Sequence, residues 1–95
     1  MAAYVIVDLD VQDARAFEEY RKQVGAVIER FGGRPIVRGG RSETLEGDWQ
    51  PKRLVVLEFP SWDKAMAFYS SPEYQPLREL RFRSARSKLV VVEGA

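Results

Sequence analysis

The sequence predicts an α+β protein with a four-stranded antiparallel sheet. Four short runs are rich in β-branched and apolar residues, which is typical of strands. The segments between them show helical periodicity, with N-cap residues at their starts. The chain has 95 residues, of which 45% are hydrophobic and 31% charged. These values suit a single folded domain over residues 1–95.

The first half of the chain is expected to form a strand, a helix and a second strand. Residues 4–10 are β-branched and aromatic and predict the first strand. Asp13 is a candidate N-cap, and the apolar residues after it recur at steps of three and four. Gly32-Gly33 ends the helix, because glycine accepts the left-handed conformation found after many helices. Residues 34–40 predict the second strand.

The second half is expected to form a strand, an interrupted helical segment and a last strand. Residues 52–59 and residues 87–93 have the composition of strands. Between them, residues 61–70 predict a helix with a serine at its N-cap. A second helix start follows at Ser71, but Pro76 removes a helical hydrogen-bond donor. We therefore expect the ordered part of that helix to begin near Pro76.

The predicted order β-α-β-β-α-β is the ferredoxin-like pattern, with sheet order 4-1-3-2 and all helices on one face. The sheet face under the helices is apolar in every long strand, but so is the opposite face, which carries Ile6, Val56 and Val90. A face this apolar is rarely left in water. Packing two sheets face to face would cover it. The sequence thus predicts a homodimer formed through this outer face.

Strict alternation also places three charged residues on the outer face: Asp8, Arg38 and Glu58. A charge in a covered interface needs a partner, because an unpaired buried charge costs several kcal/mol. Two interpretations stay open. These residues form ion pairs across or around the interface, or they form a polar ligand site.

Composition excludes several chemistries. The chain has no cysteine and no histidine, which removes thiolate nucleophiles, histidine bases and the common ligands of zinc and haem. No glycine-rich dinucleotide fingerprint follows the first strand, and no carboxylate loop suits a metal ion, so we expect neither cofactor nor metal. The net charge of +1 and a third strand without stacking aromatics argue against a nucleic-acid partner. No apolar run is long enough to span a bilayer, which argues against a membrane partner. A cytoplasmic location is expected.

Six residues are candidate site residues. Arg38 precedes two glycines that allow close approach of a carboxylate or phosphate, and Glu58 is the best carboxylate for acid–base chemistry. Tyr74 and Arg81 lie at helical spacing on one face and offer hydrogen-bond donors. Trp49 is either a lid over a ligand or an aromatic residue at the rim of a dimer interface. The sixth candidate is Asp8.

Short motifs distributed along nearly the whole chain resemble the DUF1330 family. They are Val37-Arg38-Gly39-Gly40, Glu46-Gly47-Asp48-Trp49, Glu58-Phe59-Pro60-Ser61 and Ser71-Pro72-Glu73-Tyr74. The resemblance implies a ferredoxin-like chain that dimerises as a dimeric α/β barrel, but no settled activity. Wider relatives of that fold include cofactor-independent monooxygenases, haem-degrading enzymes and small-ligand isomerases.

Two functional hypotheses follow. The first is a small-molecule enzyme or ligand-binding protein that acts as a homodimer on a small organic anion, without a prosthetic group. The second is a non-catalytic dimeric interaction or regulatory module whose sheet face serves only to dimerise. A cavity beside Arg38, Glu58, Tyr74 or Arg81 favours the first, and a filled interface with every charge paired favours the second. If Arg38 and Glu58 stand at opposite sheet ends, the site forms either across the dimer or under the helices around Arg81.

Overall fold

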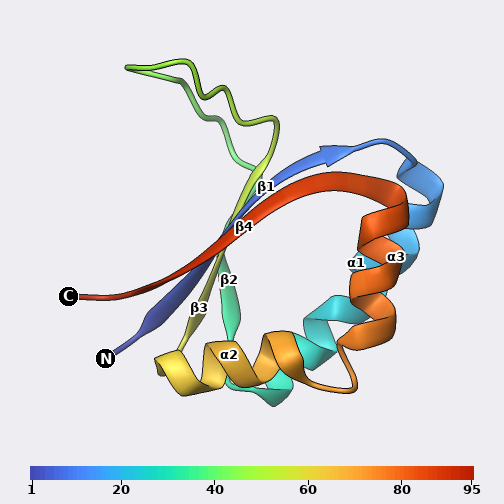
Figure 1. Ribbon diagram of the computed structural model, residues 1–95, viewed down its shortest axis with the longest axis vertical. Helices are drawn as coiled ribbons and strands as arrows, with labels where there is room; N and C mark the ends of the chain where they lie inside the picture. The colour runs from blue at the N-terminus through green and yellow to red at the C-terminus, as the bar shows by residue number, and fades with distance from the viewer.

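The computed structural model describes all of residues 1–95, arranged as one sheet with three helices on one side (Figure 1). The elements are β1 (Ala3–Val11), α1 (Ala14–Arg30), β2 (Arg34–Arg38), β3 (Leu54–Phe59), α2 (Trp62–Ser70), α3 (Gln75–Ser84) and β4 (Ala85–Glu93). The sheet order is β2-β3-β1-β4, and every neighbouring pair is antiparallel. The predicted α+β class and the ferredoxin-like strand order are confirmed.

Helix α1 begins and ends where the sequence predicts. The Asp13 side chain accepts a hydrogen bond from the Ala16 backbone N–H at 3.1 Å, which satisfies one donor of the first turn. At the other end Gly32 has φ +79°, and the backbone N–H groups of Gly32 and Gly33 donate to carbonyls of the last turn. These two caps fix the length of α1 and hence where its inner side meets the sheet.

The helical segment after β3 is divided into α2 and α3, as the sequence predicts from Pro76. The Ser61 hydroxyl caps α2 by accepting from the Lys64 backbone N–H at 3.1 Å. The chain then turns at Ser71, whose hydroxyl accepts from the Tyr74 backbone N–H at 3.2 Å. Pro76 lies in the first turn of α3, where its missing N–H has no helical role. None of the three helices has the length and apolar composition needed to cross a membrane.

The core lies between the helices and the inner face of the sheet. Burial alternates along β1, where Val5, Val7 and Leu9 face inward. At the end of the sheet near α2, the rings of Phe59 and Phe68 lie 5.2 Å apart. The ring of Tyr74 is 4.5 Å from that of Phe68. This aromatic cluster closes one end of the space under α1 and α3.

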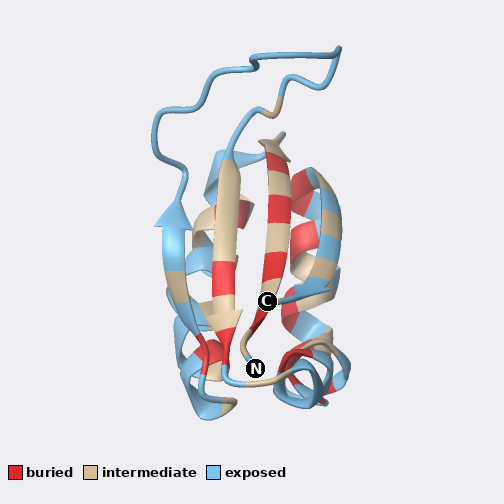
Figure 2. Ribbon diagram, turned by 90° about the vertical axis from the view of Figure 1, so that its left-hand side faces the viewer, coloured by how far each residue is buried: buried red, intermediate tan, exposed pale blue.

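The outer face of the sheet has no helix over it, as Figure 2 shows from that side. Ile6 and Val56 are directly opposed on β1 and β3, and Val90 is opposed to Ile6 on β4. Val90 is 56% exposed, and Val92 further along β4 is 44% exposed. The predicted second apolar face is therefore present and uncovered in the single chain.

One placement made from the sequence is wrong, that of Arg38 on the outer face. The ladder between β2 and β3 shifts register after Pro35, so that Pro35 pairs with Leu57 but Val37 pairs with Val56. One extra residue, Ile36, forms a β-bulge at this point, and the alternation behind it is reversed. Arg38 consequently pairs with Val55 and belongs to the helix side of the sheet.

The strands on either side of the central loop are shorter than predicted. Strand β2 ends at Arg38 and β3 begins at Leu54, so residues 39–53 form a long loop (Figure 1). The loop leaves the end of the sheet and projects away from the helices. The turn expected at Glu46-Gly47-Asp48 lies in it, with Gly47 at φ +85°. The glycine accepts this left-handed conformation because it lacks a Cβ.

Candidate functional site

A cavity of about 250 Å³ lies between the inner face of the sheet and helix α1. Its walls are mostly apolar and come from all four strands and from the inner side of α1. Several residues of the buried core, among them Val5, Val7 and Leu57, also line this space. The polar side chains in the wall are two tyrosines and four arginines, and no acidic residue lines the cavity: Tyr20, Tyr74, Arg21, Arg38, Arg53 and Arg81.

Arg81 is the innermost of these charges. It is only 1% exposed, although it carries a guanidinium group. Its Nε donates to the Tyr74 hydroxyl at 3.3 Å, and its Nη1 donates to the Ser87 hydroxyl. Its Nη2 is buried without any hydrogen-bond partner, and no carboxylate forms an ion pair with the group. The chain thus buries a positive charge that has neutral hydroxyl groups and the ring of Phe82, 5.1 Å from its Cζ, as partners but no carboxylate, at a cost of several kcal/mol.

The two tyrosines of the cavity are joined to Arg81. The hydroxyl oxygens of Tyr20 on α1 and Tyr74 before α3 lie 2.8 Å apart. Either hydroxyl can donate to the other, and the Tyr74 oxygen also accepts from the Arg81 Nε. The chain Arg81–Tyr74–Tyr20 presents hydrogen-bond donors to any molecule in the cavity, and it connects α1, α3 and, through Ser87, β4.

Burial raises the pKa of the Tyr20 phenol well above 10.0, and the neighbouring Tyr74 adds to this shift. Tyr20 is therefore a neutral donor at physiological pH. In the unfolded chain the phenol ionises near 10.0, so the unfolded state gains free energy above that pH while the folded state does not. Stability from this group is complete below pH 10 and is lost as pH rises further.

We expect the free energy of unfolding to fall above pH 10 by up to about 1.4 kcal/mol per pH unit through Tyr20 alone. Tyr20→Phe removes this contribution, so the variant should lose stability less steeply in the same range. Urea titrations between pH 8 and pH 11 measure the difference. Identical slopes for the two proteins would show that Tyr20 ionises as readily when folded as when unfolded.

The exposed residues of the cavity wall mark its entrance: they lie on α1, at the end of β2 and directly before β3. Gly25 in the middle of α1 lines the cavity, and a Cβ built on it would meet no atom within 4 Å. A glycine inside a helix costs about 1 kcal/mol relative to alanine. No crowding at this position requires glycine, and the missing side chain leaves open space on the helix side. Arg38 and Arg53 border the opposite side.

Asp8 and Trp49 lie outside the cavity, on the outer side of the sheet. The Trp49 indole N–H donates to one Asp8 carboxylate oxygen at 3.0 Å, and the Lys52 backbone N–H donates to the other at 3.1 Å. Asp8 thereby fastens the base of the central loop to β1. Trp49 is 51% exposed and does not cover the cavity. Of the two interpretations of Trp49, this position favours an aromatic residue at the rim of an interface.

Glu58 also lies on the outer side, at the far end of the sheet from Asp8. It forms an ion pair with Arg34, at 2.9 Å, and accepts a hydrogen bond from the Tyr4 hydroxyl at 3.3 Å. Its side chain is 26% exposed and faces away from the cavity walls. The structure therefore brings Arg38, Tyr74 and Arg81 to one cavity and leaves Glu58, Asp8 and Trp49 outside it. No group of three acidic residues lies together as a metal ion would need.

Sequence reasoning did not single out Tyr20, Gly25 or Arg53. Tyr20 occupies a position in the apolar stripe of α1, where an aromatic ring is expected to pack and its hydroxyl draws no attention. A signal for Gly25 was present, because a glycine in the middle of a long predicted helix is unfavourable. Arg53 has no sequence signal, since its position depends on how β2 and β3 pair.

Solved structures share this fold. A protein of unknown function from Rhodopseudomonas palustris superposes with a TM-score of 0.78 at 20% identity, covering 99% of this chain and 82% of its own. A dimeric ferredoxin-like protein of unknown function from Jannaschia sp. CCS1 gives 0.65 at 16% identity, covering 99% and 100%. SnoaB, a cofactor-independent oxygenase from Streptomyces nogalater, gives 0.60 at 14% identity, covering 99% and 92%. At these identities the likeness shows the fold alone.

No curated protein matches the chain. The model of one protein family, described as a domain of unknown function, matches residues 2–95. This match spans nearly all of the sequence and includes the motifs that suggested the same family. The chain therefore belongs to the DUF1330 family.

Proposed function

We propose that the protein is a homodimer that binds a small organic anion with an apolar body in the cavity under its helices. The observation that carries this proposal is Arg81, a buried guanidinium with an unpartnered Nη2 in a cavity wall without a single acidic residue. A ligand carboxylate supplies the missing counter-charge. The planar guanidinium matches a carboxylate with paired donors, and such hydrogen bonds are strongest where water is excluded.

The walls specify the rest of the ligand. Most of the lining is aliphatic or aromatic, which suits an apolar body. A volume of about 250 Å³ corresponds to roughly eight waters at ~30 Å³ each, so the part of the ligand that enters is small. Because Nη2 has almost no accessible surface in the free protein, binding requires the Arg81 side chain to turn toward the ligand. The long, flexible stem of arginine allows such a turn.

The same side chains define the chemistry available at the site. Arg81 presents only donors and the two tyrosine hydroxyls can donate as well, so together they stabilise negative charge on a carboxylate, a carbonyl or an oxyanion. Tyr20 is the group at the end of the hydrogen-bonded chain, and its raised pKa keeps it a neutral hydrogen-bonding group rather than an acid. Proton transfer at Glu58 would require a separate site on the outer side of the sheet. The cavity is therefore suited above all to binding a ligand, and the one chemical effect that its side chains offer is to stabilise an oxyanion.

The homodimer forms through the outer face of the sheet. The apolar side chains of that face, Ile6, Val56 and Val90, are uncovered by any part of the chain. A structural neighbour from Jannaschia sp. CCS1 is itself a dimeric ferredoxin-like protein. In this arrangement the two cavities lie on opposite outer sides of the dimer, one under the helices of each protomer. Trp49 and Asp8 border the interface.

A thermal-shift screen of small carboxylates tests the proposal. A ligand that binds only the native state at about 100 times its Kd stabilises it by about 2.7 kcal/mol, which raises the Tm by roughly ten degrees in a chain of this size. We expect monocarboxylates with apolar bodies to shift the Tm and the corresponding amides and alcohols not to. If carboxylates and neutral analogues have equal or no effect, the ligand hypothesis is wrong and the interaction module replaces it.

A further inference from the structure

We propose that the ligand carries a second anionic group, which Arg38 and Arg53 hold at the entrance to the cavity. This inference rests on the proposed function and specifies its ligand class as an elongated dianion with an apolar middle. Arg81 takes one end inside, the apolar walls contact the middle, and the pair at the entrance takes the other end. Three features of the structure support it.

The first feature is the β-bulge at Ile36. Regular alternation would turn Arg38 toward the outer face, where Glu58 and the dimer interface lie. The register shift after Pro35 turns it instead into the wall of the cavity. Bulges that re-aim a side chain are common beside functional sites. Here the bulge adds the positive charge of Arg38 to a cavity wall that already includes Arg81.

The second feature is the contact between Arg53 and Gly39. A Cβ built on Gly39 would lie 2.8 Å from both Cγ and Nε of Arg53 and 3.1 Å from its Cζ. Gly39 also has φ +72°, so glycine is favoured here for two reasons. The missing side chain lets the Arg53 guanidinium lie over the backbone that directly follows Arg38. The two arginines are thereby held at the same end of the same pair of strands.

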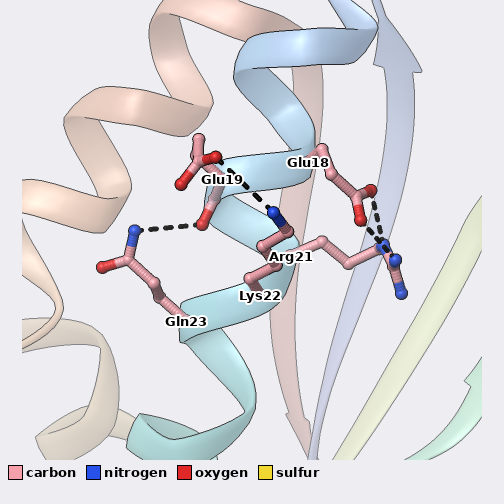
Figure 3. Close-up of polar contacts among 5 residues, drawn as sticks. All are labelled: Glu18, Glu19, Arg21, Lys22 and Gln23. Carbon is pink, nitrogen blue, oxygen red and sulfur yellow. Dashed lines mark hydrogen bonds and ion pairs between the residues drawn. The ribbon is translucent and has the colours of Figure 1, made fainter.

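The third feature is the lack of any acidic partner for this pair. The third arginine near the entrance, Arg21, is neutralised by Glu18, whose two oxygens accept from it at 2.6 Å and 2.9 Å (Figure 3). Neither Arg38 nor Arg53 forms an ion pair or a side-chain hydrogen bond. Two like charges held together without a counter-ion repel each other, and an anion between them removes that repulsion. Opposite them, Gly25 leaves the entrance open.

Matched ligands that differ only in the second charge test the inference. Octanoate and its dicarboxylic counterpart suberate have the same carbon chain, and shorter and longer pairs (hexanoate with adipate, decanoate with sebacate) vary the reach. Titration calorimetry at low salt gives the ratio of the two affinities for each pair. In the wild-type protein we expect one dicarboxylate of the series to bind about tenfold more tightly than its monocarboxylate. The advantage should shrink at high salt, because the entrance is exposed.

Variants assign that advantage to the entrance. Arg38→Gln and Arg53→Gln should each lower the dicarboxylate-to-monocarboxylate affinity ratio, by about tenfold in the double variant. Arg41→Gln, which removes an exposed loop arginine outside the cavity, should leave the ratio as in wild type. If monocarboxylates bind through Arg81 but the ratio is the same in all variants, the second anion site is refuted and the proposed function stands. If no member of either series binds, both are refuted.

Discussion

Arg81→Met should abolish ligand binding while leaving the free protein about as stable as wild type. Methionine fills a similar volume and removes the charge, so the cost of burying an unpaired guanidinium is removed as well. That gain offsets the lost hydrogen bonds to Tyr74 and Ser87, and we expect the free energy of unfolding to stay within about 1 kcal/mol of wild type. Affinity for the carboxylate that binds most tightly to wild type should fall at least about 30-fold, which is the loss expected when one side chain of a buried charge pair is truncated.

Two further variants show whether this effect belongs to the guanidinium. Arg83→Met removes an exposed arginine of the same helix that does not line the cavity, and it should bind the ligand as wild type does. Arg81→Lys keeps the charge but loses the planar guanidinium with its paired donors, so its affinity for the ligand should lie between those of wild type and Arg81→Met. For each protein, denaturant titration gives the free energy of unfolding and calorimetry gives the affinity for the ligand. A large loss of stability in Arg81→Met with unchanged affinity would identify Arg81 as a purely structural residue.

Val90→Asp should convert the dimer into a folded monomer. Val90 is 56% exposed in the single chain, so an aspartate there is tolerated by the protomer. In a sheet-to-sheet interface the same aspartate is buried without a partner in both copies, which costs several kcal/mol. Light scattering at micromolar concentration should give about twice 10.9 kDa for wild type and about 10.9 kDa for the variant. Val90 is a better position for this test than the half-buried Val56, because an aspartate at Val56 would also disturb folding of the protomer.

The matched control is Met66→Asp, which changes an exposed apolar residue on α2, away from the outer face of the sheet. It should remain dimeric. Circular dichroism of all three proteins establishes that each is folded. A wild-type protein that scatters as a monomer, or a Val90→Asp variant that remains a dimer, would contradict assembly through this face.

Local signals predicted most of the fold. Asp13 and Ser61 are N-caps in the structure as in the sequence, and α3 begins with Pro76 in its first turn, where the missing donor predicts. These features depend on residues close together in the chain, so local chemistry decides them. The pairing of strands followed from their order, because the ferredoxin-like connection leaves one arrangement. The second apolar face followed from alternation along three strands.

The candidate site could be predicted only in part. Tyr74 and Arg81 lie in one cavity because they lie a helical repeat apart, which the sequence shows directly. The side of the sheet on which Arg38 lies depends on a single bulged residue, and alternation cannot locate that residue. The cavity itself left no sequence signal. An apolar pattern identifies which face of a strand is covered, but not how far from it the covering helix lies.

The central claim, that Arg81 is the internal anchor for a ligand anion, is tested most directly by a crystal structure of the protein with a carboxylate found in the thermal-shift screen. We predict a carboxylate inside the cavity under α1, with both oxygens within hydrogen-bond distance of the Arg81 guanidinium and the Tyr20 hydroxyl nearby. A ligand bound elsewhere, with the Arg81 Nη2 still unpartnered, would contradict the claim.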